Sequence, residues 1–317
     1  MSKTLLLIGG TGFFGKSILK YLYYHKNFFK KKFSKIIILS RKKIKINFYK
    51  DLKKSFKIIK VNSNIMNIKK LPYADYVIYA AILKNYKNDH KAVKRYLDLA
   101  NKYHLKSKIL YISSGAVYGM QNNYIIRFKE NYLEFNKKIQ FKKSYKKDYS
   151  NVKLKNENLF QKFAQKGGKV SIARCFSFVG EYLPQDSYYV VGNFIKSILN
   201  KESIAIKANY QVLRSYMHEN DLVKWLLKIL NNSNKDCPIY NVGSDDVISI
   251  HKLSTMLTKK YNLPQEFNNT KITIKKFDKY IPNIYKAKKE LNLKNNYDTL
   301  TAIIKTVNLL KKNEKNN

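Results

Sequence analysis

The chain has 317 residues, of which 44% are hydrophobic, so it is long enough for one large or two smaller folded domains. Its 63 Lys and Arg residues against 21 Asp and Glu residues give a formal net charge of +42, which favours anionic ligands. The lysines run along the whole chain and arginine occurs only at 41, 95, 127, 174 and 214, so a dedicated nucleic-acid-binding protein is disfavoured.

Short apolar runs alternate with helical patterns up to residue 176. The apolar runs predict strands at 3–9, 35–40, 56–61, 75–81, 108–114 and 169–176. Apolar residues at helical spacing predict helices at 13–25, 89–104 and 149–166, the last ending at Gly167 and Gly168. Because the strands are nearly continuous apolar runs, helices should cover both faces of their sheet. The alternation therefore predicts an α/β fold with a Rossmann-type doubly wound parallel sheet.

The pattern loosens after Gly180. It predicts a helix near 190–200, strands at 203–207 and 212–218, a helix at 220–230, and a strand at 238–243 that can rejoin the sheet. The rest, 250–317, is mixed helix and strand. We predict a first domain of residues 1–175 with returning segments near 219–250, and a smaller C-terminal α/β domain, mainly 176–317. The Lys-rich segment 120–148 is expected to be a loop near the functional site.

The numbers and spacing of the cysteines and histidines limit which disulfides and metal sites the protein can have. Two cysteines are too few for a disulfide scaffold, and the five histidines lack the spacing of metal ligands. No stretch approaches the ~20 apolar residues of a membrane span, and the N-terminal apolar run is too short for a signal peptide. We expect a cytoplasmic protein with no metal site and no membrane contact.

The first predicted strand leads into the sequence "GGTGFFGKS", residues 9–17. In a strand–turn–helix setting, Gly9 permits a sharp turn, Gly12 lets a pyrophosphate approach the backbone, and Gly15 lets the helix pack closely. The helix N-terminus adds N–H donors and a partial positive charge. The motif predicts a dinucleotide site.

The second strand ends in Ser40, Arg41 and Lys42 with no carboxylate for a ribose 2′-hydroxyl, which favours NADP, with NAD as the alternative.

A second motif follows the strand at 108–114. Tyr149 and Lys153 lie four residues apart on one helical face, and a lysine ammonium beside a phenol lowers the tyrosine pKa. The same spacing occurs at Tyr49/Lys53 and Tyr285/Lys289, so spacing alone is not decisive. Position favours Tyr149, because Ser114 ends the preceding strand where ligands bind in open α/β sheets. Tyr149 is thus a candidate acid/base and Ser114 a candidate partner of the same substrate oxygen.

These motifs together resemble the extended short-chain dehydrogenases/reductases, specifically the NAD-dependent epimerase/dehydratase family that acts on nucleotide sugars. The resemblance covers nearly the whole chain. It rests on "GGTGFFG", "SSGAVYG", "YSNVKLKNE", "IARCFSFVG", "RSYMHENDLVKWLL", "YNVGSDDVISIHKL" and "IPNIYKAKKELNL". In "YSNVKLKNE" the final residue, Glu157, matches a glutamate that is frequent in the family.

The resemblance implies a role for each matching residue. Catalysis would fall to Ser114, Tyr149 and Lys153, and Ser114 would also contact the substrate with Asn193 and Arg214. Tyr149 and Lys153 would contact the coenzyme as well. The remaining coenzyme contacts would be Gly9, Thr11, Gly12, Phe13, Phe14, Gly15, Ser40, Arg41, Asn64, Ile65, Ala80 and Ala81. Asn64-Ile65 stands where the family usually has Asp-Ile.

The resemblance also implies the reaction class. A Rossmann domain would bind NADP or NAD, and the C-terminal domain would close over a nucleotide-linked sugar for epimerisation or 4-keto reduction in surface-polysaccharide precursor synthesis. Gly115 and Ala116 replace the Asp-Glu pair of sugar 4,6-dehydratases, which disfavours that reaction. Helices 89–104 and 149–166 are candidates for a homodimer interface. A non-catalytic NADP sensor and a basic nucleic-acid-binding protein remain alternatives, and no motif names the sugar.

Overall fold

The computed structural model describes residues 3–121, 124–135, 144–185, 189–206, 208–267 and 273–315. The chain divides into two compact units. The first comprises Met1–Val117, Lys143–Cys175 and Val223–Tyr240, and the second comprises Tyr118–Lys142, Phe176–Leu222 and Asn241–Asn317. The expected loop at 120–148 lies partly outside the described residues.

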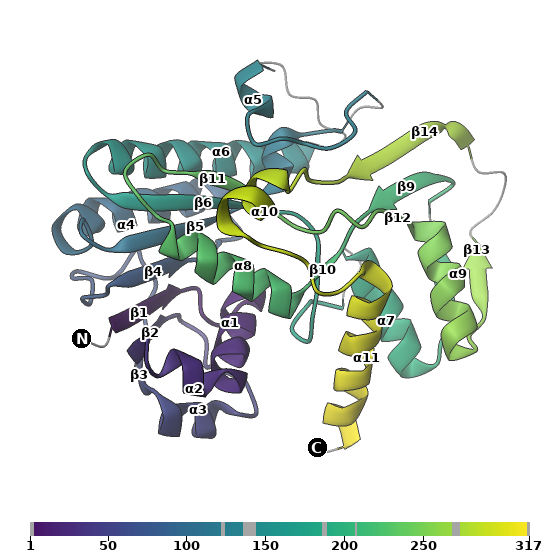
Figure 1. The fold of residues 1–317 in the computed structure, drawn as a ribbon, viewed down its shortest axis with the longest axis horizontal. Helices are drawn as coiled ribbons and strands as arrows, with labels where there is room; N and C mark the ends of the chain where they lie inside the picture. Colours follow the sequence, from purple (N-terminus) through teal and green to yellow (C-terminus); the bar gives the residue numbers. More distant parts are fainter. Residues whose placement is uncertain are drawn as a thin grey trace. The chain divides into compact units, whose positions relative to one another are not determined.

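A seven-stranded sheet forms the centre of the first unit, in the order β11-β6-β5-β4-β1-β2-β3 (Figure 1). Its strands are β1 (Lys3–Ile8), β2 (Phe33–Leu39), β3 (Lys57–Val61), β4 (Tyr76–Tyr79), β5 (Lys108–Ser114), β6 (Lys169–Cys175) and β11 (Ile239–Val242). The pairs from β3 through β6 are parallel. The Rossmann-type α/β fold is therefore confirmed, and the strand predicted at 238–243 does join the sheet.

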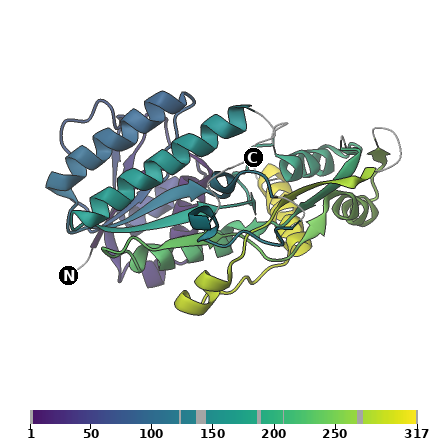
Figure 2. The same ribbon diagram turned by 90° about the horizontal axis from the view of Figure 1, so that it is seen from above.

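Helices cover both faces of this sheet (Figure 2). On one face lie α4 (Tyr86–Tyr103) and α6 (Ser144–Gln165), and on the other lie α1 (Phe13–Tyr24) and α8 (Glu219–Asn231). Alternate strand residues such as Leu6, Val77 and Ile109 pack against Val93 of α4 and Phe160 of α6, and all are fully buried. This two-sided burial explains why the strands are continuous apolar runs.

Most predicted elements of the first unit are confirmed within a few residues. α6 begins at Ser144, earlier than the predicted 149, and ends just before Gly167, whose φ of +99° is one that glycine adopts readily. Two short helices were not predicted, α2 (Lys26–Phe29) and α3 (Tyr49–Ser55).

The second unit contains smaller sheets. β9 (Tyr210–Arg214) pairs antiparallel with β12 (Ile248–Ser249) and parallel with β14 (Thr273–Tyr280). The parallel pairs are β7 (Phe178–Val179) with β10 (Met217–His218), and β8 (Ile204–Ile206) with β13 (Gln265–Phe267). Its helices are α5 (Tyr132–Phe135), α7 (Val190–Asn200), α9 (Ile250–Tyr261), α10 (Tyr285–Leu291) and α11 (Thr299–Lys315). The predicted strand 212–218 is thus two strands that pair with different partners.

No helix in the described part of the chain combines the length and apolarity needed to cross a membrane.

Candidate functional site

The loop between β1 and α1 is shaped by glycines with different roles. Gly9 has a φ of +91°, and a β-carbon there would lie 2.6 Å from the backbone nitrogen of Ala81. A β-carbon at Gly15 would lie 2.3 Å from the Cα of Gly10, so α1 can pack on the loop only if this residue is glycine. Both glycines are therefore required by the fold itself.

Gly12 differs from the other two glycines of the motif. A β-carbon there would have Gly9 O, at 3.7 Å, as its nearest neighbour, so packing within the protein does not require a glycine. Gly12 is the N-cap of α1 and contributes no side-chain cap, and the first turn of the helix has no acidic residue. The space beside Gly12 and the positive end of the helix dipole suit a phosphate that approaches the backbone.

The carboxyl end of β2 carries the residues predicted to select the coenzyme. Ser40 Oγ lies 2.7 Å from Thr11 Oγ1, which ties the strand end to the glycine loop. Arg41 is exposed, and among the described residues it has no hydrogen-bond or ion-pair partner. Lys60, from the neighbouring β3, donates to the Ser40 carbonyl and to Asn62 Oδ1 at 2.6 Å, and burial lowers the pKa of Lys60. The sequence analysis did not select Lys60, although β2 and β3 are neighbouring parallel strands whose carboxyl ends lie at the same edge of the sheet.

Asn64 forms a local turn with its side chain. Its Oδ1 accepts hydrogen bonds from the backbone N–H groups of Met66, at 2.8 Å, and Asn67, at 3.1 Å. These two N–H donors fix the amide orientation, because only the oxygen can accept. Asn64 thus presents its Nδ2 as a donor, where a carboxylate could only accept. The neighbouring Ile65 is buried in the apolar core.

Ala80 and Ala81 follow β4 and form the wall against the glycine loop. Ala80 N donates to Ile8 O at 2.9 Å, which continues the pairing of β4 with β1. The backbone of Ala81 leaves no room for a side chain at Gly9. Phe13 and Phe14, the first residues of α1, are partly exposed, and their rings form an edge-to-face pair with centroids 5.5 Å apart.

Ser114 and Tyr149 meet at the carboxyl end of β5. The Ser114 hydroxyl lies close enough to Tyr149 to influence its pKa, and Ser114 Oγ accepts from Ala116 N at 3.2 Å. Burial raises the pKa of Tyr149 above its ordinary value, while the nearby Ser114 hydroxyl acts in the opposite direction. The expectation that the pKa of Tyr149 is lowered is therefore wrong for the protein alone, because burial outweighs the favourable contacts.

Lys153 lies one helical turn further along α6 and is 4% exposed. Its Nζ donates to the Ile112 carbonyl of β5 at 3.0 Å and lies 5.0 Å from the centroid of the Tyr111 ring. The ammonium is thus held beneath the strand that ends in Ser114. The structure thus places Ser114 at the end of β5, with Tyr149 and Lys153 one turn apart on α6 beside that strand.

Two buried polar networks support this arrangement, and sequence reasoning assigned neither. Glu157 accepts from Ser113 Oγ at 2.5 Å and from Arg174 Nη2 at 2.8 Å, with the glutamate 2% and the arginine 4% exposed. On α4, Asp89 accepts from Asn156 Nδ2 at 3.1 Å. Burial raises the pKa of Asp89, and the positive charge of Lys153 opposes this shift.

Asn193 and Arg214, the residues predicted to contact the substrate, belong to the second unit. Asn193 is partly exposed in the first turn of α7. Arg214 ends β9, and its Nη2 lies 3.1 Å from Asp278 Oδ1 while its Nη1 donates to the Asp278 carbonyl at 2.8 Å. The guanidinium is therefore already paired with a carboxylate, which spacing could not reveal.

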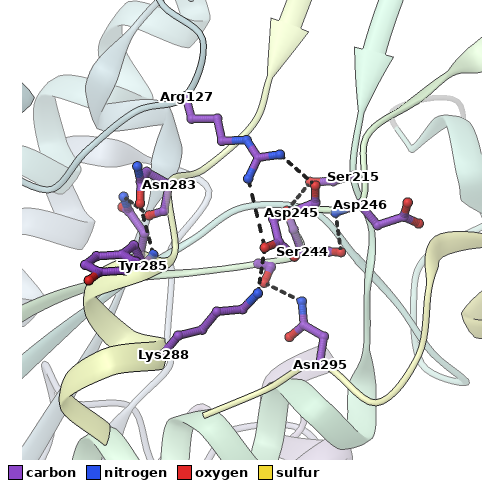
Figure 3. A network of polar contacts seen from close by, with 11 residues as sticks. Arg127, Ser215, Ser244, Asp245, Asp246, Asn283, Tyr285, Lys288 and Asn295 are labelled. Atoms are coloured by element: carbon purple, nitrogen blue, oxygen red, sulfur yellow. Dashed lines mark hydrogen bonds and ion pairs between the residues drawn. The ribbon is translucent and has the colours of Figure 1, made fainter. Parts of the chain in front are cut away.

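The second unit also contains a polar network around Asp245 (Figure 3). Lys288 Nζ lies 2.6 Å from Asp245 Oδ2, and Arg127 donates to the Asp245 carbonyl at 3.1 Å. Ser215 Oγ donates to Ser244 O at 2.6 Å beside them. These contacts join four segments distant in sequence, so Arg127 and Lys288 have a structural role within this unit.

A model of the NAD dependent epimerase/dehydratase family matches residues 5–243, well over half of the chain. The chain belongs to this family. The matched range includes the glycine loop, the β5 end and the helix with Tyr149 and Lys153. A comparison with curated proteins gives no match.

Solved structures of the epimerase/dehydratase type share the fold. dTDP-glucose 4,6-dehydratase from Bacillus anthracis is 17% identical with a TM-score of 0.77, covering 99% of this chain and 98% of that chain. UDP-N-acetylglucosamine 4-epimerase from Bacillus cereus is 18% identical with a TM-score of 0.74, covering 98% and 97%. UDP-glucose 4-epimerase from Thermotoga maritima is 18% identical with a TM-score of 0.75, covering 98% and 99%. At such identities the likeness establishes the fold alone.

In this epimerase/dehydratase, Ser114 is followed by Gly115 and Ala116, which open a short 3-10 helix, Gly115–Tyr118. Neither side chain can transfer a proton. A dehydration at this site would therefore need an acid and a base from elsewhere in the chain.

Proposed function

We propose that this member of the epimerase/dehydratase family is an NAD(P)-dependent nucleotide-sugar epimerase or 4-ketoreductase with Ser114, Tyr149 and Lys153 as its catalytic residues. The observation that supports it is that the Ser114 hydroxyl lies close enough to Tyr149 at the carboxyl end of β5 to influence its pKa, with buried Lys153 one turn away. Ligands bind at this edge of open α/β sheets. Gly115 and Ala116 argue against a 4,6-dehydratase. The products would serve surface-polysaccharide synthesis in the cytoplasm.

The first unit would bind the coenzyme. The free space at Gly12 and the absence of acidic residues in the first turn of α1 fit a pyrophosphate. The exposed Arg41, which has no ion-pair partner among the described residues, fits a 2′-phosphate and favours NADP over NAD. Asn64 would donate from Nδ2 to a ring nitrogen of the adenine, where an aspartate would accept from its amino group. When bound, the nicotinamide supplies hydride transfer to or from the sugar carbon.

The side chains at the β5 end would move the proton. Burial raises the pKa of Tyr149, so at neutral pH Tyr149 carries its proton and can donate it to a carbonyl oxygen that is being reduced. Ser114 would donate a hydrogen bond to the same oxygen. Lys153 would stabilise the phenolate that remains, through its fixed positive charge. A protonated Tyr149 is the state that 4-keto reduction requires at the start of the reaction.

The second unit would bind the nucleotide-linked sugar through Asn193 and Arg214. The ion pair with Asp278 fixes the orientation of the Arg214 guanidinium, which still has donors beyond those used.

Two copies of the chain would associate through α4 and α6 of the first unit. Light scattering should then give a mass of two chains, and a single-chain mass at micromolar concentration would contradict the dimer.

The first test is to denature purified protein and identify any released dinucleotide by mass spectrometry. One retained NAD(H) per chain supports an epimerase that recycles its coenzyme and contradicts the preference for NADP. Protein that binds NADPH reversibly supports the ketoreductase.

The second test compares Tyr149→Phe with Tyr285→Phe as a matched control, because Tyr285 has the same spacing to a lysine and is 64% exposed. Turnover of UDP- and dTDP-linked sugars or their 4-keto forms should fall at least about 100-fold in the first variant only. Retained turnover in Tyr149→Phe, with intact coenzyme binding, would favour a non-catalytic sensor. Retention on DNA in moderate salt, with a base preference, would favour the nucleic-acid alternative.

A further inference from the structure

A second polar pocket lies in the first unit, at the edge of the sheet where the parallel strands begin. Its volume is about 420 Å³, within the range of small-ligand sites. It is lined by the first residues of β1, β5 and β6, by the chain before β4, and by the end of α4. The glycine loop follows the carboxyl end of β1, so the two sites occupy opposite edges of the same sheet.

The lining of this pocket is strongly cationic. Its charged residues are Lys3, Lys102, Lys106, Lys108, Lys169 and Asp75. Lys108 and Lys169 are register partners on the neighbouring strands β5 and β6, a placement in which like charges are destabilising. In the part of the chain that the structure describes, none of the five lysines forms an ion pair with a carboxylate.

Asp75 does not neutralise these lysines. Its Oδ2 accepts from Thr4 N at 2.7 Å and its Oδ1 accepts from the Tyr73 hydroxyl at 3.0 Å, and its single negative charge can balance at most one of the five lysines. The C-terminal end of α4 adds only roughly half an elementary negative charge. Five lysines therefore line this pocket with one carboxylate and the end of α4, and Lys108 Nζ also donates to the Asn231 carbonyl.

The pKa shifts of the lysines at this edge agree with the excess of positive charge. The pKa of Lys108 is lowered by burial and then by the charges of Lys169 and Lys3. The pKa of Lys32, next to the pocket, is lowered by burial and then by Lys108, Lys3 and Lys228. These lysines repel one another across the strand ends, and a bound anion would relieve that repulsion.

We propose that this pocket binds a small anion with at least two adjoining phosphate groups. Several lysines around one pocket match a compact polyanion, because each lysine acts as a point charge toward phosphate oxygens. The exposed ring of Tyr73 at the rim can in addition stack on a base. An inorganic polyphosphate and the diphosphate of a nucleotide share this chemistry.

The test is isothermal titration with tripolyphosphate and with ADP, in the presence of saturating coenzyme so that the glycine loop is occupied. The double variant Lys3→Gln/Lys169→Gln removes two exposed lysines of the pocket. The control Lys252→Gln/Lys259→Gln removes two exposed lysines of α9 in the second unit, with the same change in net charge.

We expect one tripolyphosphate per chain, bound at least about tenfold more weakly by the pocket variant and within about twofold of the native affinity by the control. Equal affinity for tripolyphosphate and ADP identifies an inorganic ligand, and tighter ADP binding identifies a nucleotide. Equal losses in both variants, no loss in either, or no binding to the native protein would overturn the proposal.

A measurement on the native protein removes any dependence on the folding of the variants. The NMR signal of the Lys108 side chain should report a pKa that rises when tripolyphosphate is added. A pKa of Lys108 that does not move at saturating tripolyphosphate would place the anion elsewhere and contradict the proposed site.

Discussion

The buried ion pair between Glu157 and Arg174 should contribute strongly to the stability of the first unit. Three donors point at the glutamate: Arg174 Nη2 at 2.8 Å from Oε2, Arg174 Nε at 3.2 Å from both oxygens, and Ser113 Oγ at 2.5 Å from Oε1. Both charged side chains are almost fully buried. Replacing Glu157 with leucine keeps the volume and removes the acceptor for all three.

The expected cost follows from leaving a buried guanidinium without its carboxylate. Breaking a buried pair by removing one partner costs about 3–5 kcal/mol. A typical domain has a total stability of about 5–15 kcal/mol, so Glu157→Leu should remove a large share of it. Replacing both residues with leucine removes the orphaned charge as well. The double variant Glu157→Leu/Arg174→Leu should therefore be more stable than Glu157→Leu, by about 1–3 kcal/mol.

Urea unfolding followed by tryptophan fluorescence can measure these differences. Trp225 is the single tryptophan and is fully buried in α8, in the part that belongs to the first unit, so its signal reports on that unit. The midpoint should fall markedly for Glu157→Leu and recover partly in the double variant. The loss of stability in the double variant could instead equal the sum of the losses in Glu157→Leu and Arg174→Leu. In that case the orphaned charge is not the cause of the loss, and this reasoning fails.

Three further predictions concern the coenzyme and the proton. Because the pKa of Tyr149 is raised, kcat/KM for keto reduction should stay constant through neutral pH. It should fall only when strongly alkaline pH removes the proton from Tyr149. A fall near neutrality in a pH–rate profile would contradict this. Gly15→Ala should destabilise the protein by about 1–3 kcal/mol in thermal unfolding, whereas Gly12→Ala should leave Tm unchanged and weaken coenzyme binding roughly tenfold. Equal Tm values for the two glycine variants would refute the distinction. Arg41→Ala should raise the Kd for NADPH about tenfold without changing that for NADH, and the exposed Lys43→Ala should change neither; titration by fluorescence decides.

The central sheet was predictable because its cause is local. A strand buried on both faces must be apolar at nearly every position, so β1, β5 and β6 stand out in the sequence. The short α3 has a single buried residue, Leu52, and gives no comparable periodic signal. Where 212–218 divides into β9 and β10, the Ser215 hydroxyl donates to the carbonyl of Ser244. Such a contact between distant segments leaves no pattern in either segment.

The candidate site shows how much of its structure the spacing of Tyr and Lys residues can predict. The three Tyr-x-x-x-Lys pairs are equivalent in sequence, yet Lys53 and Lys289 lie over the rings of their own tyrosines, at 4.9 and 5.9 Å from the centroids. Lys153 instead donates to the Ile112 carbonyl of β5 and lies over the Tyr111 ring. The difference arises because α6 packs on the sheet, which offers Lys153 buried acceptors that a surface helix lacks. Sequence position after β5 therefore identified the pair, but the raised pKa of Tyr149 depends on burial that only the packed fold supplies.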